Sequence, residues 1–232
     1  MSSFIAVEGL IGVGKTSLCR LLEKRLDAEL ILEPADDNPF LANFYSDPDR
    51  FAFPTQMFYL ATRCKQQSRL LQPSLFSKVF VSDYLFEKDR IFAKMTLMGE
   101  ELDLYDRFTA LLQQAIAVPD FILFLDAPTE VIMSRIKRRG IEAEQAIQES
   151  YIEDLRRRYF DLWCTYDKAP VYVLDTTSID YIDDTDAQDL MIDMVKGWIR
   201  NEPHPAAPQV YSGELHHQMS IFDALVMDGI SK

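Results

Sequence analysis

Residues 9–17 carry the pattern of a phosphate-binding loop. The run Gly-Leu-Ile-Gly-Val-Gly-Lys-Thr fits G-x-x-x-x-G-K-[ST], follows an apolar run at 4–7 and precedes apolar residues at helical spacing. Glycines let the backbone curl closely around a phosphate with its N–H groups pointing inward. A glycine-rich turn that binds nothing is the weaker interpretation, because every position and both flanks fit. We therefore expect a nucleoside triphosphate to contact Gly9, Leu10, Ile11, Gly12, Val13, Gly14, Lys15, Thr16 and Ser17.

Two side chains of this loop have distinct expected roles. Lys15 is predicted to bring a mobile charge to the outer phosphates. Thr16 is predicted to offer its hydroxyl to Mg²⁺.

Two carboxylates stand at the ends of apolar runs. Glu33 follows the run at 30–32, and Asp83 follows the run at 79–82. Because ligands of parallel sheets bind at the carboxyl ends of the strands, we expect both side chains on the side of the phosphate-binding loop. A carboxylate there can orient a hydroxyl nucleophile, which phosphoryl transfer needs more than a strong base. Asp83 is also a candidate ligand of Mg²⁺, whereas Glu33 could instead cap a turn.

A basic cluster at 134–139 is a further candidate for phosphate binding. Arg135 and Arg139 are four residues apart and so share a helix face. A guanidinium can bridge two phosphate oxygens and offset charge in a transition state. The alternative is a basic helix end that complements the helix dipole. A local basic cluster in a chain of net charge −13 favours phosphate.

These residues must be positioned by a sheet and its helices. Apolar runs predict five strands, at 3–8, 30–32, 79–83, 121–126 and 171–175. Helices are expected at 17–27, 40–45, 54–71, 85–98, 102–117, 129–139, 143–166 and 186–200. The alternation implies an α/β fold, a five-stranded parallel sheet with helices on both faces. One domain is expected over 1–201, followed by a proline-rich linker and tail over 202–232.

Composition excludes several classes of function. The chain has 24 basic and 37 acidic residues, so polymer DNA or RNA is not an expected partner. The three cysteines are widely spaced and form no metal-binding pattern. No apolar run approaches membrane-spanning length, and the N-terminus shows no targeting segment. We therefore expect a cytoplasmic protein without a membrane anchor.

Several stretches, taken in order, resemble the deoxynucleoside kinase family, closest to its bacterial deoxyadenosine and deoxyguanosine kinase branch. The loop at 9–16 alone is generic, but the ordered set over about residues 3–175 is specific. The matching stretches are that loop, Glu33-Pro34, residues 38–41 leading to Phe44-Tyr45, Phe53-x-x-Gln56 with Arg63, residues 83–93, and Arg135-x-x-x-Arg139 before Tyr151-x-Glu153.

The resemblance implies a P-loop kinase fold and a reaction. The γ-phosphate of ATP would pass, with Mg²⁺ as cofactor, to the 5′-hydroxyl of a deoxynucleoside in deoxynucleotide salvage. The bacterial branch implies a purine deoxynucleoside, deoxyadenosine or deoxyguanosine.

Roles for individual residues follow from the same resemblance. Glu33 resembles the carboxylate that accepts the proton of the 5′-hydroxyl, with Asp83 near it. Residues 134–145 resemble the lid, on which Arg135 and Arg139 contact phosphates.

The substrate-binding residues are also implied. Gln56 resembles the amide that reads the base, because an amide has paired donor and acceptor groups. Arg63 and Asp89 resemble the charged pair that frames the base, and Phe92 resembles an aromatic that stacks on it. Tyr45 and Glu153 resemble the groups that hold the sugar 3′-hydroxyl. Without the resemblance, these side chains would be interpreted as a solvated helix face or as core residues.

The chain departs from the family pattern in two places. Many relatives carry an arginine after the carboxylate of the third strand, where this chain has Tyr84. Arg63 or Arg90 are candidates to supply that charge. Ile141 stands where some relatives have a further lid arginine.

Other functions are weaker interpretations. A nucleoside monophosphate kinase resembling thymidylate kinase would need an extra basic contact near the sugar, and Tyr84 weakens this reading. A guanine-nucleotide switch usually needs Asn-Lys-x-Asp, which the sequence lacks. An inactive scaffold is opposed by the retained Lys15, Thr16, Glu33 and Asp83.

Two partners are considered. The family resemblance implies a homodimer, for which the apolar region at 92–112 is suitable. Residues 218–222, Gln-Met-Ser-Ile-Phe, resemble peptides that dock on the bacterial sliding clamp. Docking of this segment on the protein's own core is the stronger interpretation, because so short a pattern arises often by chance.

Overall fold

The computed structural model describes residues 3–33, 37–70, 79–112, 116–141, 144–177, 179–202, 204–208 and 210–211, apart from the side chains of Tyr45, Ser68 and Arg69. The tail at 214–232, with the clamp-like segment at 218–222, therefore lies outside the described residues. None of the described helices is long and apolar enough to cross a bilayer.

The expected parallel sheet is confirmed. Its strands are β1 (Ser3–Gly9), β2 (Glu29–Ile31), β3 (Val79–Ser82), β4 (Phe121–Asp126) and β5 (Val171–Asp175). They lie in the order β2-β3-β1-β4-β5, and every pairing is parallel. β1 and β4 are buried along nearly their whole length, as expected for strands with helices on both sides. The carboxyl end of β1 therefore lies at the middle of the sheet.

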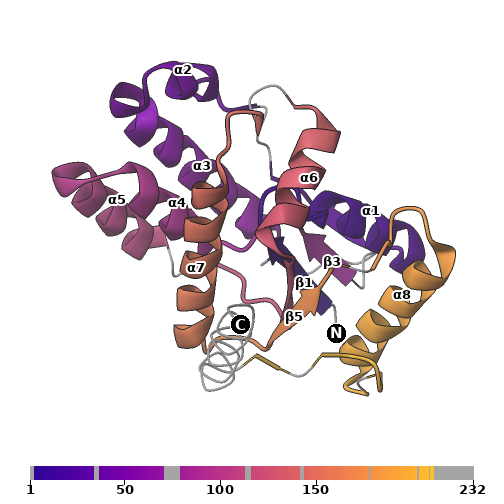
Figure 1. The fold of residues 1–232 in the computed structure, drawn as a ribbon. Helices are drawn as coiled ribbons and strands as arrows, with labels where there is room; N and C mark the ends of the chain where they lie inside the picture. The colour runs from indigo at the N-terminus through magenta and orange to yellow at the C-terminus, as the bar shows by residue number, and fades with distance from the viewer. Residues whose placement is uncertain are drawn as a thin grey trace.

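Helices cover both faces of the sheet (Figure 1). α1 packs against β1, β2 and β3 and also touches α8, whereas α7 touches both α4 and α6. The helices are α1 (Lys15–Leu26), α2 (Leu41–Ser46), α3 (Pro48–Leu70), α4 (Lys88–Thr96), α5 (Gly99–Leu112), α6 (Thr129–Arg139), α7 (Glu149–Thr165) and α8 (Thr185–Arg200). α5 lies at the outer edge of the molecule, away from the sheet (Figure 1).

Several helix boundaries differ from the sequence prediction, among them that of α5, which begins at Gly99 instead of residue 102. α3 begins at Pro48 instead of residue 54, because proline fits the first helical position, where its missing N–H is not needed. α7 begins at Glu149 instead of residue 143. The turn before it makes i→i+3 bonds, such as Ile147 N–H to Glu144 O at 3.1 Å, and so imitates helical spacing. α4 begins at Lys88, after a turn at 85–87.

Part of the predicted linker packs on the domain. Val210 forms an antiparallel bridge with Tyr172 of β5, and the N–H of Tyr211 donates to Val171 O at 2.7 Å. The ring of Tyr211 lies 5.7 Å from that of Phe160 on α7. β5 is an edge strand, and these contacts satisfy backbone groups that it would otherwise expose.

Candidate active site

The phosphate-binding loop connects β1 to α1, as the motif predicts. Gly14 has φ 111°, and a Cβ atom there would lie 2.3 Å from Tyr181 Oη. Gly9 has φ 149°, and a Cβ atom there would lie 2.4 Å from Leu125 O. Glycine is therefore required at both positions. The Lys15 ammonium donates to Gly9 O at 2.8 Å and Leu10 O at 3.0 Å, which holds it over the loop.

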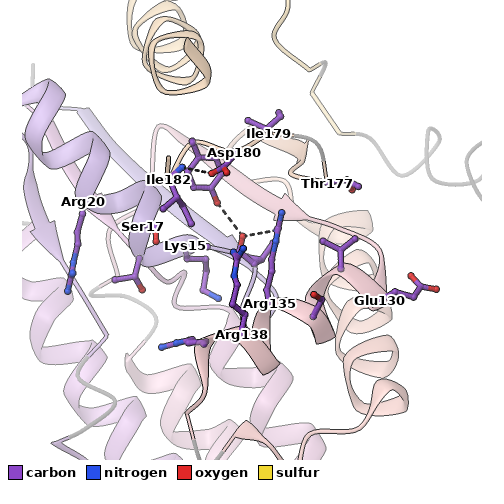
Figure 2. A pocket seen from close by; sticks show the side chains of 18 residues that line it. Lys15, Ser17, Arg20, Glu130, Arg135, Arg138, Thr177, Ile179, Asp180 and Ile182 are labelled. Atoms are coloured by element: carbon purple, nitrogen blue, oxygen red, sulfur yellow. Dashed lines mark hydrogen bonds between the residues drawn. The ribbon is translucent and has the colours of Figure 1, made fainter. Parts of the chain in front are cut away.

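A cavity of about 890 Å³ opens beside this loop and has the character of a phosphate site. Figure 2 shows Lys15 of α1 with Arg135 and Arg138 of α6 around it. The other walls come from residue 177, from residues 179–182 and from the loop itself. Cations that converge with a helix N-terminus suit the phosphates of a nucleotide.

The predicted arginines of α6 lie in different environments. Arg135 donates to Val13 O at 3.3 Å, to Thr176 Oγ1 at 2.8 Å and to Thr176 O at 2.6 Å. Arg139 is 53% exposed and pairs with Glu144 Oε1 at 3.3 Å. Both line the cavity, but Arg135 is fixed to the phosphate-binding loop whereas Arg139 is held by one solvated contact.

A second cavity, of about 810 Å³, lies on the other side of Lys15, which lines both. Apolar and aromatic side chains form much of its wall, as in sites for small organic ligands. It brings together four of the predicted substrate residues, Glu33, Gln56, Arg63 and Phe92.

The remaining predicted substrate residues are placed differently. Asp83 does not line this cavity but contacts the backbone of Glu33 and the Thr16 hydroxyl. Asp89 is buried and pairs with Arg63 instead of lining the cavity. Glu153 is exposed on α7, and its neighbour Asp154 lines the cavity in its place. The side chain of Tyr45 lies outside the described residues. The roles of Glu153 and Tyr45 stay predictions.

Glu33 is the centre of a charge network at the end of β2. Arg63 Nη2 donates to its Oε1, and Lys88 Nζ donates to its Oε2 at 2.7 Å. Its backbone N–H donates to Asp83 Oδ1 at 2.7 Å. Asp83 Oδ2 in turn accepts a hydrogen bond of 3.5 Å from Thr16. The two predicted carboxylates and the loop threonine are thus brought into one chain of contacts.

Burial changes the protonation equilibria of this site. It lowers the pKa of Lys15 to about 8 and that of Lys88 to about 8, because a buried ammonium loses its hydration. Burial also raises the pKa of Asp83, an effect that the nearby Lys88 and Lys15 oppose. Shifted groups clustered beside two cavities are typical of an active site.

Comparison with known proteins identifies the family. A family model described as deoxynucleoside kinase matches residues 5–200. The chain belongs to the deoxynucleoside kinase family. It is 32% identical over 209 residues to the deoxyadenosine/deoxycytidine kinase of Bacillus subtilis, with 86% of this chain and 94% of the relative covered. It is 35% identical over 157 residues to the deoxyguanosine kinase of the same organism, covering 67% and 76%.

Solved structures agree with the sequence comparison. The deoxyadenosine kinase from M. mycoides with bound dATP has a TM-score of 0.69 at 25% identity, and the match covers 85% of this chain and 99% of that one. The same enzyme with dCMP and dCDP gives a TM-score of 0.68 at 26% identity, covering 85% and 98%. The protein is an ATP-dependent deoxynucleoside kinase with a P-loop kinase fold, and the alternative of a thymidylate-like kinase is not favoured.

Tyr84, which stands where many relatives carry an arginine, is fully buried in this kinase. Its hydroxyl donates to Gln66 Oε1 at 2.8 Å, and its ring lies 5.5 Å from the Arg63 guanidinium. Arg90, one candidate for the missing charge, instead makes an exposed pair with Asp106 at 3.0 Å. Arg63, the other candidate, reaches Glu33.

Sequence reasoning missed two buried charges of the kinase. Glu8 is fully buried and accepts from Leu85 N–H at 2.6 Å, Gly9 N–H at 3.1 Å and Tyr159 Oη at 2.9 Å. The sequence feature that could have identified Glu8 is its position, as an acidic residue between the apolar run and the first glycine of the loop. Lys88 was missed as well, although it stands four residues before Phe92 and so shares its helix face.

Proposed function

We propose that this kinase phosphorylates the 5′-hydroxyl of a purine deoxynucleoside, deoxyadenosine or deoxyguanosine, in deoxynucleotide salvage. The observation that carries the proposal is the pair of cavities that meet at Lys15, one lined by cations and the other by Glu33, Gln56 and Phe92. Because Lys15 lines both cavities, a phosphoryl group held by its ammonium lies at the boundary between them.

The triphosphate binds on the cationic side in this proposal. The loop at 9–17 surrounds the phosphates, and Lys15 leaves the carbonyls of Gly9 and Leu10 to hold the outer ones. Arg135 fixes the loop through Val13 O and also faces the phosphates. Arg139 leaves its ion pair with Glu144, binds the transferring phosphoryl group and offsets the charge of that group.

Thr16 and Asp83 are suited to hold Mg²⁺ beside the phosphates. Their oxygens are 3.5 Å apart, and Mg²⁺ prefers oxygen ligands. Among the described residues no group of three or more His, Cys, Asp or Glu residues forms a metal site. A site with few protein ligands fits an ion that is shared with phosphate oxygens and water. When bound, the ion neutralises charge on the phosphates.

Glu33 accepts the proton of the 5′-hydroxyl. Its carboxylate lines the nucleoside cavity near Lys15 and is oriented by Arg63 and by its backbone bond to Asp83. The nucleophile is thereby positioned toward the phosphates.

The base occupies the wall formed by α3 and α4. The Gln56 side chain donates to Thr96 Oγ1 at 3.2 Å, which orients its amide toward a base edge. Phe92 stacks on the base, and Asp89 acts through Arg63, which it holds. We assign the sugar 3′-hydroxyl to Tyr45 and Glu153 on the family resemblance alone.

The base preference is tested with a nucleoside panel. The relatives are named for deoxyadenosine, deoxyguanosine and deoxycytidine, so deoxycytidine is the competitor that matters. We expect the highest kcat/KM, measured as ADP release, for deoxyadenosine or deoxyguanosine. Gln56→Ala should lower kcat/KM for the preferred base by about 10- to 200-fold, because it removes the paired contacts. A wild-type preference for deoxycytidine or thymidine refutes the purine assignment.

The assembly and location of the kinase are proposed as well. We propose a cytoplasmic homodimer with a catalytic domain over 1–201 and a tail over 202–232. Leu104, Phe108 and Leu111 support the dimer, because they are 43%, 41% and 76% exposed and lie on one face of α5. Docking of residues 218–222 on a sliding clamp stays a weaker hypothesis than packing of the tail on the kinase itself.

A further inference from the structure

Lys88 is a buried lysine in an unfavourable place. It is 5% exposed, and it begins α4, where the helix dipole repels a cation. Arg63 and Lys15 add like charge close to it. A charge held at this cost at the wall of a substrate cavity calls for a functional explanation.

The contacts of Lys88 locate its ammonium at the reacting end of that cavity. It donates to Glu33 Oε2 at 2.7 Å and lies 6.0 Å from the centre of the Phe92 ring. Its charge also helps to lower the pKa of Lys15, so the two ammoniums are close enough to repel each other. An anion between them would relieve this repulsion.

We propose that Lys88 is a further catalytic residue, whose ammonium passes from Glu33 to the transferring phosphoryl group during the reaction. This inference rests on the proposed function of Glu33 as proton acceptor.

The charges balance in this step. The 5′-O–H bond breaks and its proton moves to Glu33, while the O–P bond to the 5′-oxygen forms. The bond between the β,γ-bridging oxygen and the γ-phosphorus breaks, and its electron pair leaves with ADP. Glu33 is then neutral and releases Lys88, just as the dianionic phosphate ester forms beside it.

Arg63 cannot follow the phosphate in the same way. It is also paired with the buried Asp89, and its guanidinium lies over the rings of Tyr59 and Tyr84 at 5.2 and 5.5 Å. Among the described residues, Glu33 is the acid with which Lys88 forms an ion pair, and that acid becomes protonated. Lys88 is therefore the cation that is set free.

Equilibrium binding separates this role from a structural one. We expect Lys88→Met to weaken binding of deoxyadenosine 5′-monophosphate by about 10- to 100-fold and to lower kcat by about 100- to 1000-fold. Binding of deoxyadenosine itself should stay within about three-fold, because the nucleoside carries no phosphate. Lys88→Arg should recover most of the monophosphate affinity. Arg90→Met on the same helix should leave the affinity for both ligands unchanged. Loss of both affinities, or of neither, overturns the proposal.

A wild-type measurement keeps the test valid if Lys88→Met fails to fold. In protein labelled with ¹⁵N-lysine, the Lys88 ammonium, assigned by its loss in Lys88→Arg, should shift with the monophosphate and not with deoxyadenosine. An equal shift with both ligands contradicts the proposal. If wild-type enzyme instead prefers deoxycytidine, the proposed base fails, and the same comparison with deoxycytidine and its monophosphate still decides the role of Lys88.

Discussion

At the scale of single residues, Glu33 combines two demands that conflict. Arg63 and Lys88 fix its two oxygens, and yet one oxygen must receive a proton. Orientation outweighs basicity here, because phosphoryl transfer depends mainly on placing the nucleophile.

Replacement of Glu33 by glutamine tests this balance. Glu33→Gln keeps the shape of the side chain but cannot accept the proton, so kcat should fall by about 10²- to 10⁴-fold. ADP release measures the rate, and circular dichroism checks the fold. The control is Glu87→Gln, which removes an acid paired with Lys168 at 2.8 Å, outside the lining of both cavities. A Glu33→Gln rate within a few-fold of wild type would exclude Glu33 as the proton acceptor.

Lys15 should couple binding of ATP to proton uptake. Its pKa is lowered to about 8 by burial, so at pH 8.5 a substantial fraction is neutral. Phosphate oxygens favour the charged form and raise this pKa, so binding of ATP–Mg²⁺ draws protons from the buffer.

Calorimetry in buffers of different ionisation enthalpy measures this uptake. The observed enthalpy at pH 8.5 should rise with the ionisation enthalpy of the buffer. The slope should fall toward zero near pH 6.5, where Lys15 is already charged. It should be smaller at pH 8.5 in Lys15→Arg, whose charge does not titrate, which leaves Lys88 as the neighbouring lysine with a lowered pKa. A slope that is unchanged in Lys15→Arg would assign the proton to another group.

At the scale of elements, α6 presents Arg135, Arg138 and Arg139 to one cavity, and the two arginines that were predicted there have different attachments. Arg135 ties α6 to Val13 O and to Thr176, whereas Arg139 makes one exposed contact with Glu144. The shared helix face predicted from their spacing therefore does not make them equivalent.

Alanine substitutions should separate the two arginines. Arg135→Ala removes charge-assisted bonds and should lower the free energy of unfolding by about 1.5–3 kcal/mol, in addition to activity. Arg139→Ala should leave stability within about 0.5 kcal/mol and should mainly lower kcat. Urea unfolding and steady-state kinetics measure both effects. A change confined to the KM for ATP in Arg139→Ala would contradict its role at the transferring phosphate.

The exposed face of α5 gives a test of the proposed dimer. A charge at Leu104 or Leu111 would be buried without a partner in such an interface, so Leu104→Glu or Leu111→Glu should give monomers in light scattering. Leu190→Glu on α8, at a residue 37% exposed, is the matched control and should not change the mass. A wild-type monomer at micromolar concentration would refute the dimer.

Elements were predictable where one local pattern dominates. The apolar runs of β1 and β4 and the spacing in α6 and α8 gave these elements to within a residue or two. The start of α7 was wrong by six residues, because the turn before it satisfies its backbone in nearly helical fashion. Lys88 escaped prediction because its importance depends on its contact with Glu33, which is 55 positions away in the sequence.

At the scale of the whole molecule, strand order decides which residues meet. The order β2-β3-β1-β4-β5 sets Asp83, at the end of β3, between the phosphate-binding loop and Glu33. Periodicity predicts the strands but not their neighbours, so sequence alone gave the carboxylates without their mutual contacts.

The tail is a separate question at this scale. Deletion of 214–232 should leave kcat for nucleoside phosphorylation within about two-fold, because every residue that is assigned a catalytic or binding role precedes residue 154. A lower melting temperature would indicate that the tail packs on the domain. A synthetic peptide of residues 214–232 that does not bind the organism's own clamp at micromolar concentration would exclude docking.

The two cations on Glu33 should also limit hydrolysis of ATP when no deoxynucleoside is bound. A water molecule that enters the nucleoside cavity must compete with Arg63 and Lys88 for the Glu33 oxygens at the end that faces Lys15. A bound deoxynucleoside can win this competition, because its base and sugar contacts hold its hydroxyl in place, whereas water has no such anchor. We therefore expect the rate of ATP hydrolysis to be low in the absence of a deoxynucleoside.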